Sequence, residues 1–245
     1  MYCYKNFASI YDELIYSDVD YKNWCEKILK ICEEYSLERK NYLDLACGTG
    51  NLTVELGKNF QNVYAVDLSQ EMLTIAEEKL RGNGIRAKVF CQNICNLNIK
   101  NNFNLITCAL DSTNYITEKE DLKKYFQGVY SLLREDGLFI FDVNSRHKLV
   151  NILGNNTFNY DSEDVVYIWE NYLEDDIVNM YLTFFVREGQ VYKRFDEEHC
   201  ERAYSEKDIE DIFSNLGFRL EKKLDCYDNI PVSEETERIT YVLRK

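Results

Sequence analysis

Two acidic residues and a loop of small residues have the types and spacing that could bind a nucleoside cofactor. The segment Leu43–Gly50 is typical of a short buried strand that ends in a turn, and Asp67 ends the next apolar run, at 63–67. Small residues let the backbone approach a ligand closely at a strand-to-helix turn, and a carboxylate about twenty residues later can bind a ribose diol. The spacing therefore predicts a cofactor that contains adenosine.

The position of Asp44 favours a cationic ligand over a dinucleotide. A pyrophosphate binds where backbone N–H groups and the helix dipole attract negative charge. The carboxylate of Asp44, at the mouth of this turn, would repel it, and the glycine motif stops after Gly48 and Gly50. An oxidoreductase of the NAD type is the competing interpretation, and it requires this loop to accept a pyrophosphate.

The pattern Asp44-x-Ala46-x-Gly48-x-Gly50, followed by Asp67, resembles that of the class I S-adenosylmethionine-dependent methyltransferases. Their cofactor carries an ammonium and a sulfonium and no phosphate, in agreement with the charge of Asp44. The resemblance covers about 1–145 and 204–245, is weakest between them, and implies S-adenosylmethionine as the cofactor. A protein that binds this cofactor without catalysis is a further alternative.

The resemblance implies a cofactor role for each residue of this region. Asp44 would bind the methionine ammonium, directly or through water, and Asp67 would bind the ribose hydroxyls. Asn93 stands where the family commonly has Asp, and its amide oxygen can still accept from the adenine amino group. The complete set of expected cofactor residues is Tyr11, Asp44, Ala46, Gly48, Gly50, Asp67, Leu68, Met72, Gln92, Asn93, Ile94, Leu110 and Asp111. Of these, Met72 is equally consistent with a core position at helical spacing.

Four further segments resemble those of small-molecule methyltransferases and indicate an acceptor site. They are Phe7-Ala8-x-x-Tyr11-Asp12, Ser112-Thr113-Asn114-Tyr115, Glu197-Glu198-His199 and Arg202-Ala203-Tyr204. The acceptor-side candidates are therefore Tyr11, Asn114, Tyr115, His199, Arg202 and Tyr204. Methyl transfer from a sulfonium mainly requires a positioned and desolvated nucleophile, so no catalytic triad is expected. We expect transfer to a nitrogen or oxygen of a small molecule, with Tyr11 in an N-terminal lid.

His199 has two interpretations. An imidazole can act as a general base near neutral pH, but a histidine on a strand can equally lie at the surface. On a regular strand His199 and Arg202 would face opposite sides, so we expect at most one of them to point into the site. His147 lies outside the matching segments and is expected to be structural.

The expected elements form an α/β fold. Strands are predicted at 41–46, 63–67, 87–92, 103–110 and 137–143, and helices at 4–16, 20–36, 51–59, 69–82 and 118–134. Asp18 or Asp20 can cap the second helix, Thr117-x-x-Glu120 is a capping-box signature, and Ser205-x-x-Asp208 with Gly217 bounds a later helix. The alternation predicts a doubly wound, Rossmann-like sheet, and the family resemblance implies seven mostly parallel strands. Two final strands are expected near 218–226 and 238–244.

The region between residues 145 and 203 differs from the rest of the chain. Apolar runs at 165–169, 177–186 and 191–195, with turn signals at 174–176 and 188–189, predict antiparallel strands. We therefore expect a cofactor domain formed by 1–144 and 204–245, with 145–203 as a β insertion over the acceptor. Residues 154–201 contain twelve acidic and three basic residues, a balance of −9. These acids favour a neutral or cationic amine acceptor if they face the site, or only confer solubility if they face outward.

Composition disfavours several classes of partner. The formal net charge is −14, and no basic track that could bind nucleic acid is visible. No run of eighteen apolar residues occurs and the N-terminus lacks the apolar core of a signal peptide, which favours a cytoplasmic protein without a membrane partner. The nine cysteines are scattered, and Cys91 and Cys95 have no second metal-ligating pair, so we expect thiols and no metal.

Overall fold

A seven-stranded sheet forms the main body of the protein. The computed structural model describes residues 8–15 and 19–245, and the strand order is β10-β11-β5-β4-β1-β2-β3. Five of the strands are parallel: β1 (Asn41–Leu45), β2 (Asn62–Asp67), β3 (Ala87–Cys91), β4 (Phe103–Cys108) and β5 (Leu133–Asn144). The strand β11 (Arg238–Arg244) runs antiparallel to β5 and also pairs with β10 (Arg219–Asp225). The predicted doubly wound α/β fold is confirmed.

Helices cover both faces of this sheet because its strands are apolar on both sides. Tyr42 of β1 packs in one core with α2 (Tyr21–Glu34) and α3 (Asn51–Gly57). Its neighbour Leu43 points to the opposite core, with α5 (Lys119–Leu132) and α6 (Glu206–Asn215). A further helix, α4 (Gln70–Gly82), packs beside α3. The carboxyl ends of β1, β2 and β4 are thereby left open to a ligand.

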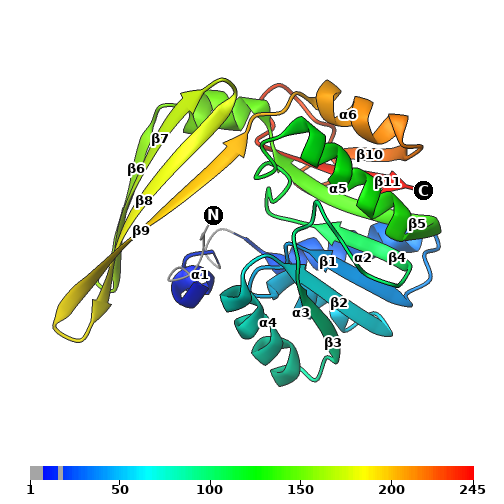
Figure 1. The fold of residues 1–245 in the computed structure, drawn as a ribbon, viewed down its shortest axis with the longest axis horizontal. Coiled ribbons are helices and arrows are strands. Elements are labelled where there is room, and N and C mark those ends of the chain that lie inside the picture. The colour runs from blue at the N-terminus through cyan, green and yellow to red at the C-terminus, as the bar shows by residue number, and fades with distance from the viewer. Residues whose placement is uncertain (1–7, 16–18) are drawn as a thin grey trace.

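A second, four-stranded antiparallel sheet projects from the main body (Figure 1). Its strands are β6 (Thr157–Asp161), β7 (Val165–Glu174), β8 (Ile177–Glu188) and β9 (Val191–Arg202). The preceding helical turn η1 (Lys148–Leu153) packs Leu149 and Leu153 against Val178 and Met180 of β8. The sequence predicted β7, β8 and the first part of β9 but neither β6 nor η1.

The N-terminal helix α1 (Ala8–Ile15) lies between the two sheets (Figure 1). Its Leu14 packs against Val165 and Phe184 of the four-stranded sheet, and Asp12 bonds to the loop after β1. Residues 4–7 and 16 of the predicted helix, and Phe7 of the N-terminal signature, lie outside the described residues.

The predicted helix caps have mixed outcomes. The side chains of Asp20 and Ser205 accept from the backbone N–H groups of Asn23 and Asp208, as expected. The capping box at Thr117 is wrong, because α5 begins after Glu118 and has no side-chain cap. The carbonyl of Thr117 instead accepts from Arg202 Nε, a contact 85 residues away that local sequence does not reveal.

The described residues contain neither a helix that could span a membrane nor a metal-binding cluster. No helix in that part of the chain combines the length and the hydropathy that a transmembrane segment needs. No cluster of three or more His, Cys, Asp or Glu side chains arranged to hold a metal ion occurs there either.

Candidate active site

The loop after β1 makes a left-handed turn that brings its backbone to the ligand cavity. Ala46, Gly48 and Gly50 have φ angles of 51°, 53° and 79°, and Gly50 N–H donates to the Cys47 carbonyl at 2.9 Å. A Cβ atom on Gly50 would lie 3.1 Å from Ala76 Cβ, whereas one on Gly48 would meet no atom within 4 Å. Gly50 therefore permits close packing of the loop on α4, and Gly48 leaves space on the cavity side.

Asp67, at the end of β2, joins this loop to the start of α4. Its Oδ2 accepts from Gly48 N–H at 2.8 Å and its Oδ1 from Ser69 N–H at 2.8 Å. Ser69 in turn caps α4 by accepting from Met72 N–H. Burial raises the pKa of Asp67 although these N–H groups favour the ionised form. The carboxylate is thus held rigidly at the cavity wall.

Asp44 is a buried carboxylate at the end of β1. Thr53 donates to its Oδ2 at 2.5 Å and Thr107 to its Oδ1 at 2.7 Å, and Tyr42 shares a hydrogen bond of 2.8 Å with Thr107. Burial raises the pKa of Asp44 to about 6 in spite of the two hydroxyl donors. A cation bound beside Asp44 would stabilise its ionised form and offset the free-energy cost of burying that charge.

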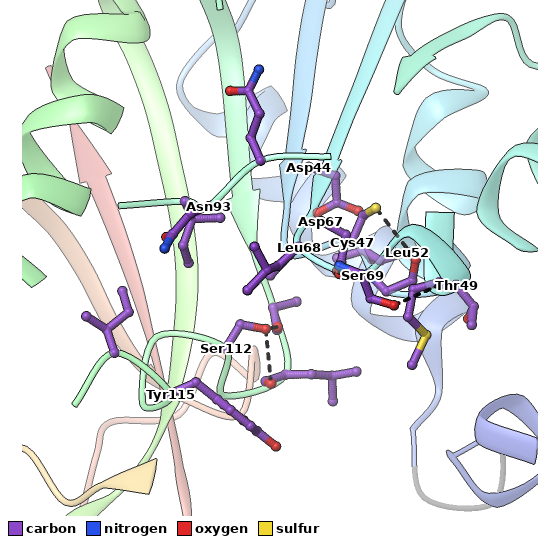
Figure 2. Close-up of a pocket in the computed structure, with 18 of the residues that line it drawn as sticks. Asp44, Cys47, Thr49, Leu52, Asp67, Leu68, Ser69, Asn93, Ser112 and Tyr115 are labelled. Atoms are coloured by element: carbon purple, nitrogen blue, oxygen red, sulfur yellow. Dashed lines mark hydrogen bonds between the residues drawn. The ribbon is translucent and has the colours of Figure 1, made fainter. Parts of the chain in front are cut away.

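A cavity of about 360 Å³ lies between these residues and the loop after β4 (Figure 2). It brings together most of the predicted cofactor residues and two of the acceptor-side candidates. Its lining includes Tyr11, Asp44, Ala46, Gly48, Asp67, Leu68, Met72, Gln92, Asn93, Ile94, Leu110 and Tyr115. The predicted residues outside the lining are Gly50, Asp111, Asn114, His199, Arg202 and Tyr204.

The turn after β3 forms the wall expected to face adenine. Asn93 Oδ1 accepts from Cys95 N–H at 2.8 Å, and Gln92 Oε1 accepts from Asn98 N–H at 2.9 Å. Both amide oxygens therefore stabilise the turn. Across the cavity Leu68 is 63% exposed, which leaves an apolar surface for a flat ring, whereas Met72 is buried.

A second left-handed turn follows β4, at the residues that the sequence predicts beside the sulfonium. Leu110 and Asp111 have φ angles of 56° and 51°. The carboxylate of Asp142, on β5, accepts from both of their backbone N–H groups, at 2.9 and 2.8 Å, and also from Tyr227 Oη at 2.6 Å. Arg238 forms ion pairs with both Asp111 and Asp142. Asp142 was not among the predicted site residues, because nothing in the local sequence distinguishes it from other strand residues.

Asn114 and Arg202 form hydrogen bonds to the backbone of neighbouring segments. The Asn114 amide is fully buried, and it donates to the carbonyls of Asn144 and Arg202 and accepts from Asn144 N–H. Arg202 Nε donates to Thr117, and Tyr204 Oη donates to Ile116. These three side chains therefore join β9 and the following segment to the loop after β4.

His199 is buried beside the cavity. It is 5% exposed, and its ring meets that of Tyr115 edge to face at 5.9 Å. Burial of β9 alternates, with Glu197, His199 and Glu201 buried and Arg202 on the opposite face, as the strand period requires. A surface histidine is thereby excluded, and burial lowers the pKa of His199 to about 4, so its imidazole is neutral at physiological pH.

Asp12 docks α1 against the cofactor loop. Thr49 Oγ1, Asn51 Nδ2 and Lys79 Nζ donate to its carboxylate at 2.6, 2.9 and 2.7 Å. Burial opposes ionisation of Asp12, but these donors outweigh it and lower its pKa. The neighbouring Tyr11 lines the cavity, so the ion pair fixes the helix that carries it.

Comparison with known proteins agrees with this geometry. Residues 43–137 match the family described as Methyltransferase domain. YqeM of Bacillus subtilis (strain 168), which is named as a methyltransferase, is 32% identical over 99% of this chain and 97% of its own. The crystal structure of an S-adenosylmethionine-dependent methyltransferase from Clostridium acetobutylicum ATCC 824 is 56% identical, with a TM-score of 0.94 over 98% of both chains. CalS10, an amino pentose methyltransferase of Micromonospora echinaspora solved with S-adenosylmethionine bound, is 13% identical with a TM-score of 0.78 over 96% of both chains.

The fold and the site define an α/β enzyme that binds an adenosine cofactor at the carboxyl ends of its strands. The chain belongs to the class I S-adenosylmethionine-dependent methyltransferases. It is therefore a transferase, and neither an NAD-type oxidoreductase nor a binding protein without catalysis. S-adenosylmethionine is its cofactor and supplies an activated methyl group.

The chain's own residues fit this cofactor. The cavity has carboxylates at separate points of its wall, Asp67 and Asp44, and none of its described lining residues is basic. Such a wall suits a ligand with a ribose diol and positive charge and disfavours a diphosphate. The open space at Gly48 lets the backbone of the loop approach the ligand.

Proposed function

We propose that this methyltransferase acts on a nitrogen or oxygen nucleophile of a small molecule bound between the loop after β4 and the buried face of β9. The observation that carries the proposal is the placement of Tyr115. Its side chain lines the cofactor cavity and also packs against His199 of β9. An acceptor beside Tyr115 would reach the cofactor's methyl group while the four-stranded sheet excludes water.

In this proposal 1–144 and 204–245 form the cofactor domain, and 145–203 roofs the acceptor. Asp67 binds the ribose hydroxyls, Asp44 acts on the aminoacyl ammonium, and the turn at Gln92, Asn93 and Ile94 contacts adenine. Leu110 and Asp111 lie nearest the sulfonium. On the acceptor side Tyr11, Tyr115 and His199 surround the nucleophile, and they hold it in line and desolvated.

The charge of the chain supports a small acceptor. A net charge of −14 gives a nucleic acid no basic track to follow. The structural neighbour CalS10 acts on an amino pentose, so a compact polar molecule is compatible with this fold.

An acceptor screen tests the proposed function. Formation of S-adenosylhomocysteine would be measured with panels of small amines and alcohols, and in parallel with transfer RNA and total protein. We expect turnover with a small-molecule panel and none with the macromolecules. As a matched control, Asp67→Ala should lose turnover through weaker cofactor binding. Transfer to macromolecules alone would refute a small-molecule acceptor and leave the methyltransferase assignment intact.

A further inference from the structure

A buried carboxylate on β9 lies outside the lining of the cofactor cavity, on the strand face that carries His199. Glu201 is 3% exposed and stands two residues from His199 on the same face of the strand. Asn144 Nδ2, at the end of β5, donates to its Oε2 at 2.8 Å. Because β9 passes the carboxyl ends of β4 and β5 here, Glu201 lies beside the turn that carries Leu110 and Asp111.

One buried polar atom beside Glu201 lacks a hydrogen-bond donor. Asn144 Oδ1 is buried and has no partner among the residues that the structure describes. Asp111, from the turn after β4, repels the charge of Glu201, whereas Arg238 of β11 and Lys148 of η1 attract it. Arg238 is already held by Asp111 and Asp142. The cluster therefore has hydrogen-bond acceptors in excess, and it would be completed by a ligand that donates an N–H or O–H bond.

We propose that Glu201 holds the nucleophile of the methyl acceptor and takes its proton. In this step the lone pair of the nitrogen or oxygen forms a bond to the methyl carbon, and the carbon–sulfur bond breaks with its electron pair on sulfur. The proton of the nucleophile passes to a carboxylate oxygen of Glu201. The proposal rests on the function proposed above, and it assigns to Glu201 the base role that the sequence had suggested for His199.

The electrostatics of the two residues support this exchange of roles. Burial lowers the pKa of His199 to about 4, which makes its imidazole a weak base. Burial, together with Asp111, raises the pKa of Glu201 well above its usual range, although Asn144, Arg238 and Lys148 oppose the shift. The same burial therefore raises the proton affinity of Glu201 and lowers that of His199.

The test uses sinefungin, a cofactor analogue in which a carbon bearing a primary amine replaces the methylated sulfur. Its ammonium occupies the place of the transferred methyl group, next to the acceptor's nucleophile. Calorimetry would compare its affinity with that of S-adenosylhomocysteine, which has no such group. We expect the protein to prefer sinefungin by on the order of tenfold, because a charge-assisted hydrogen bond is at stake. Glu201→Gln should abolish the preference and leave S-adenosylhomocysteine binding unchanged, and Glu201→Asp should retain part of it.

A matched control is Glu170→Gln, which removes a carboxylate from the exposed face of β7 and should keep the full preference. A preference that persists in Glu201→Gln, or none in the unaltered protein, would overturn the assignment. Equal loss of both ligands in Glu201→Gln would also overturn it, because the residue would then support the fold or the cofactor. The acceptor screen is an independent readout, so a failure there would reject the small-molecule acceptor without changing the sinefungin result.

Discussion

Cofactor affinity should depend on pH through Asp44. A pKa of about 6 leaves roughly nine-tenths of this carboxyl ionised at pH 7 and roughly one-tenth at pH 5. An ammonium bound near Asp44 stabilises the ionised form, so its pKa is lower in the complex than in the free protein. Affinity is therefore full above about pH 6 and falls as the pH drops through that value. Between pH 7 and 5 the expected loss is about tenfold, or about 1.4 kcal/mol.

The assay is calorimetric titration with S-adenosylhomocysteine, which has the same aminoacyl group as the cofactor. Adenosine is the matched ligand because it keeps the ribose contact to Asp67 and lacks the ammonium, so its affinity reports every other pH effect. The Asp44→Asn variant should bind S-adenosylhomocysteine about tenfold or more weakly at pH 7 and show little further change down to pH 5. Thr53→Val, which removes a donor to the ionised carboxylate, should move the midpoint above pH 6.

Two results would refute this reasoning. One is an equal pH dependence in the unaltered protein and in Asp44→Asn. The other is an equal pH dependence for adenosine and S-adenosylhomocysteine, which would place the titrating group at the ribose, with Asp67 as the first candidate.

Three further perturbations follow from the site. Asp67→Ala should weaken S-adenosylhomocysteine by about 1.5–3 kcal/mol for each ribose hydrogen bond lost, and unchanged affinity in calorimetry would remove Asp67 from the ribose site. Gly50→Ala should lower the thermal midpoint because its Cβ would lie 3.1 Å from Ala76 Cβ at a φ of 79°; a midpoint equal to that of the native protein would contradict this packing. Asp12→Asn should release α1 by removing the ion pair with Lys79, measured as faster amide exchange in residues 8–15, and unaltered exchange there would show that other contacts hold the helix.

Local sequence signals predicted most of the sheet. Apolar strands and helical periodicity act over a few residues, which is why β1 to β5 and α2 to α6 were found with small errors at their ends. The short strand β6 (Thr157–Asp161) was missed because it is mostly exposed and lacks an apolar pattern. The capping box at Thr117 failed because Arg202, distant in sequence, binds the carbonyl of that residue.

Sequence found the cofactor side of the site better than the acceptor side. The cofactor motif is contiguous, and its spacing alone places Asp44, Gly48 and Asp67 around one strand-to-helix turn. Acceptor-side groups come from segments that meet only in three dimensions. The sequence therefore suggested Asn114 for acceptor contact. In the structure its amide donates to the backbone carbonyls of Asn144 and Arg202.

The sequence by itself determined that this chain has an adenosine site with a cationic preference, because glycine positions and carboxylate spacing are local properties of the backbone. Only the tertiary structure decided which side chains are buried together. Burial lowers the pKa of His199 and raises that of Glu201. The fold also brings Asp142 to the turn after β4, where its carboxylate accepts two backbone hydrogen bonds. A side chain's dielectric surroundings and hydrogen-bond partners come from residues distant in the chain, so they arise only when the fold brings those residues into contact.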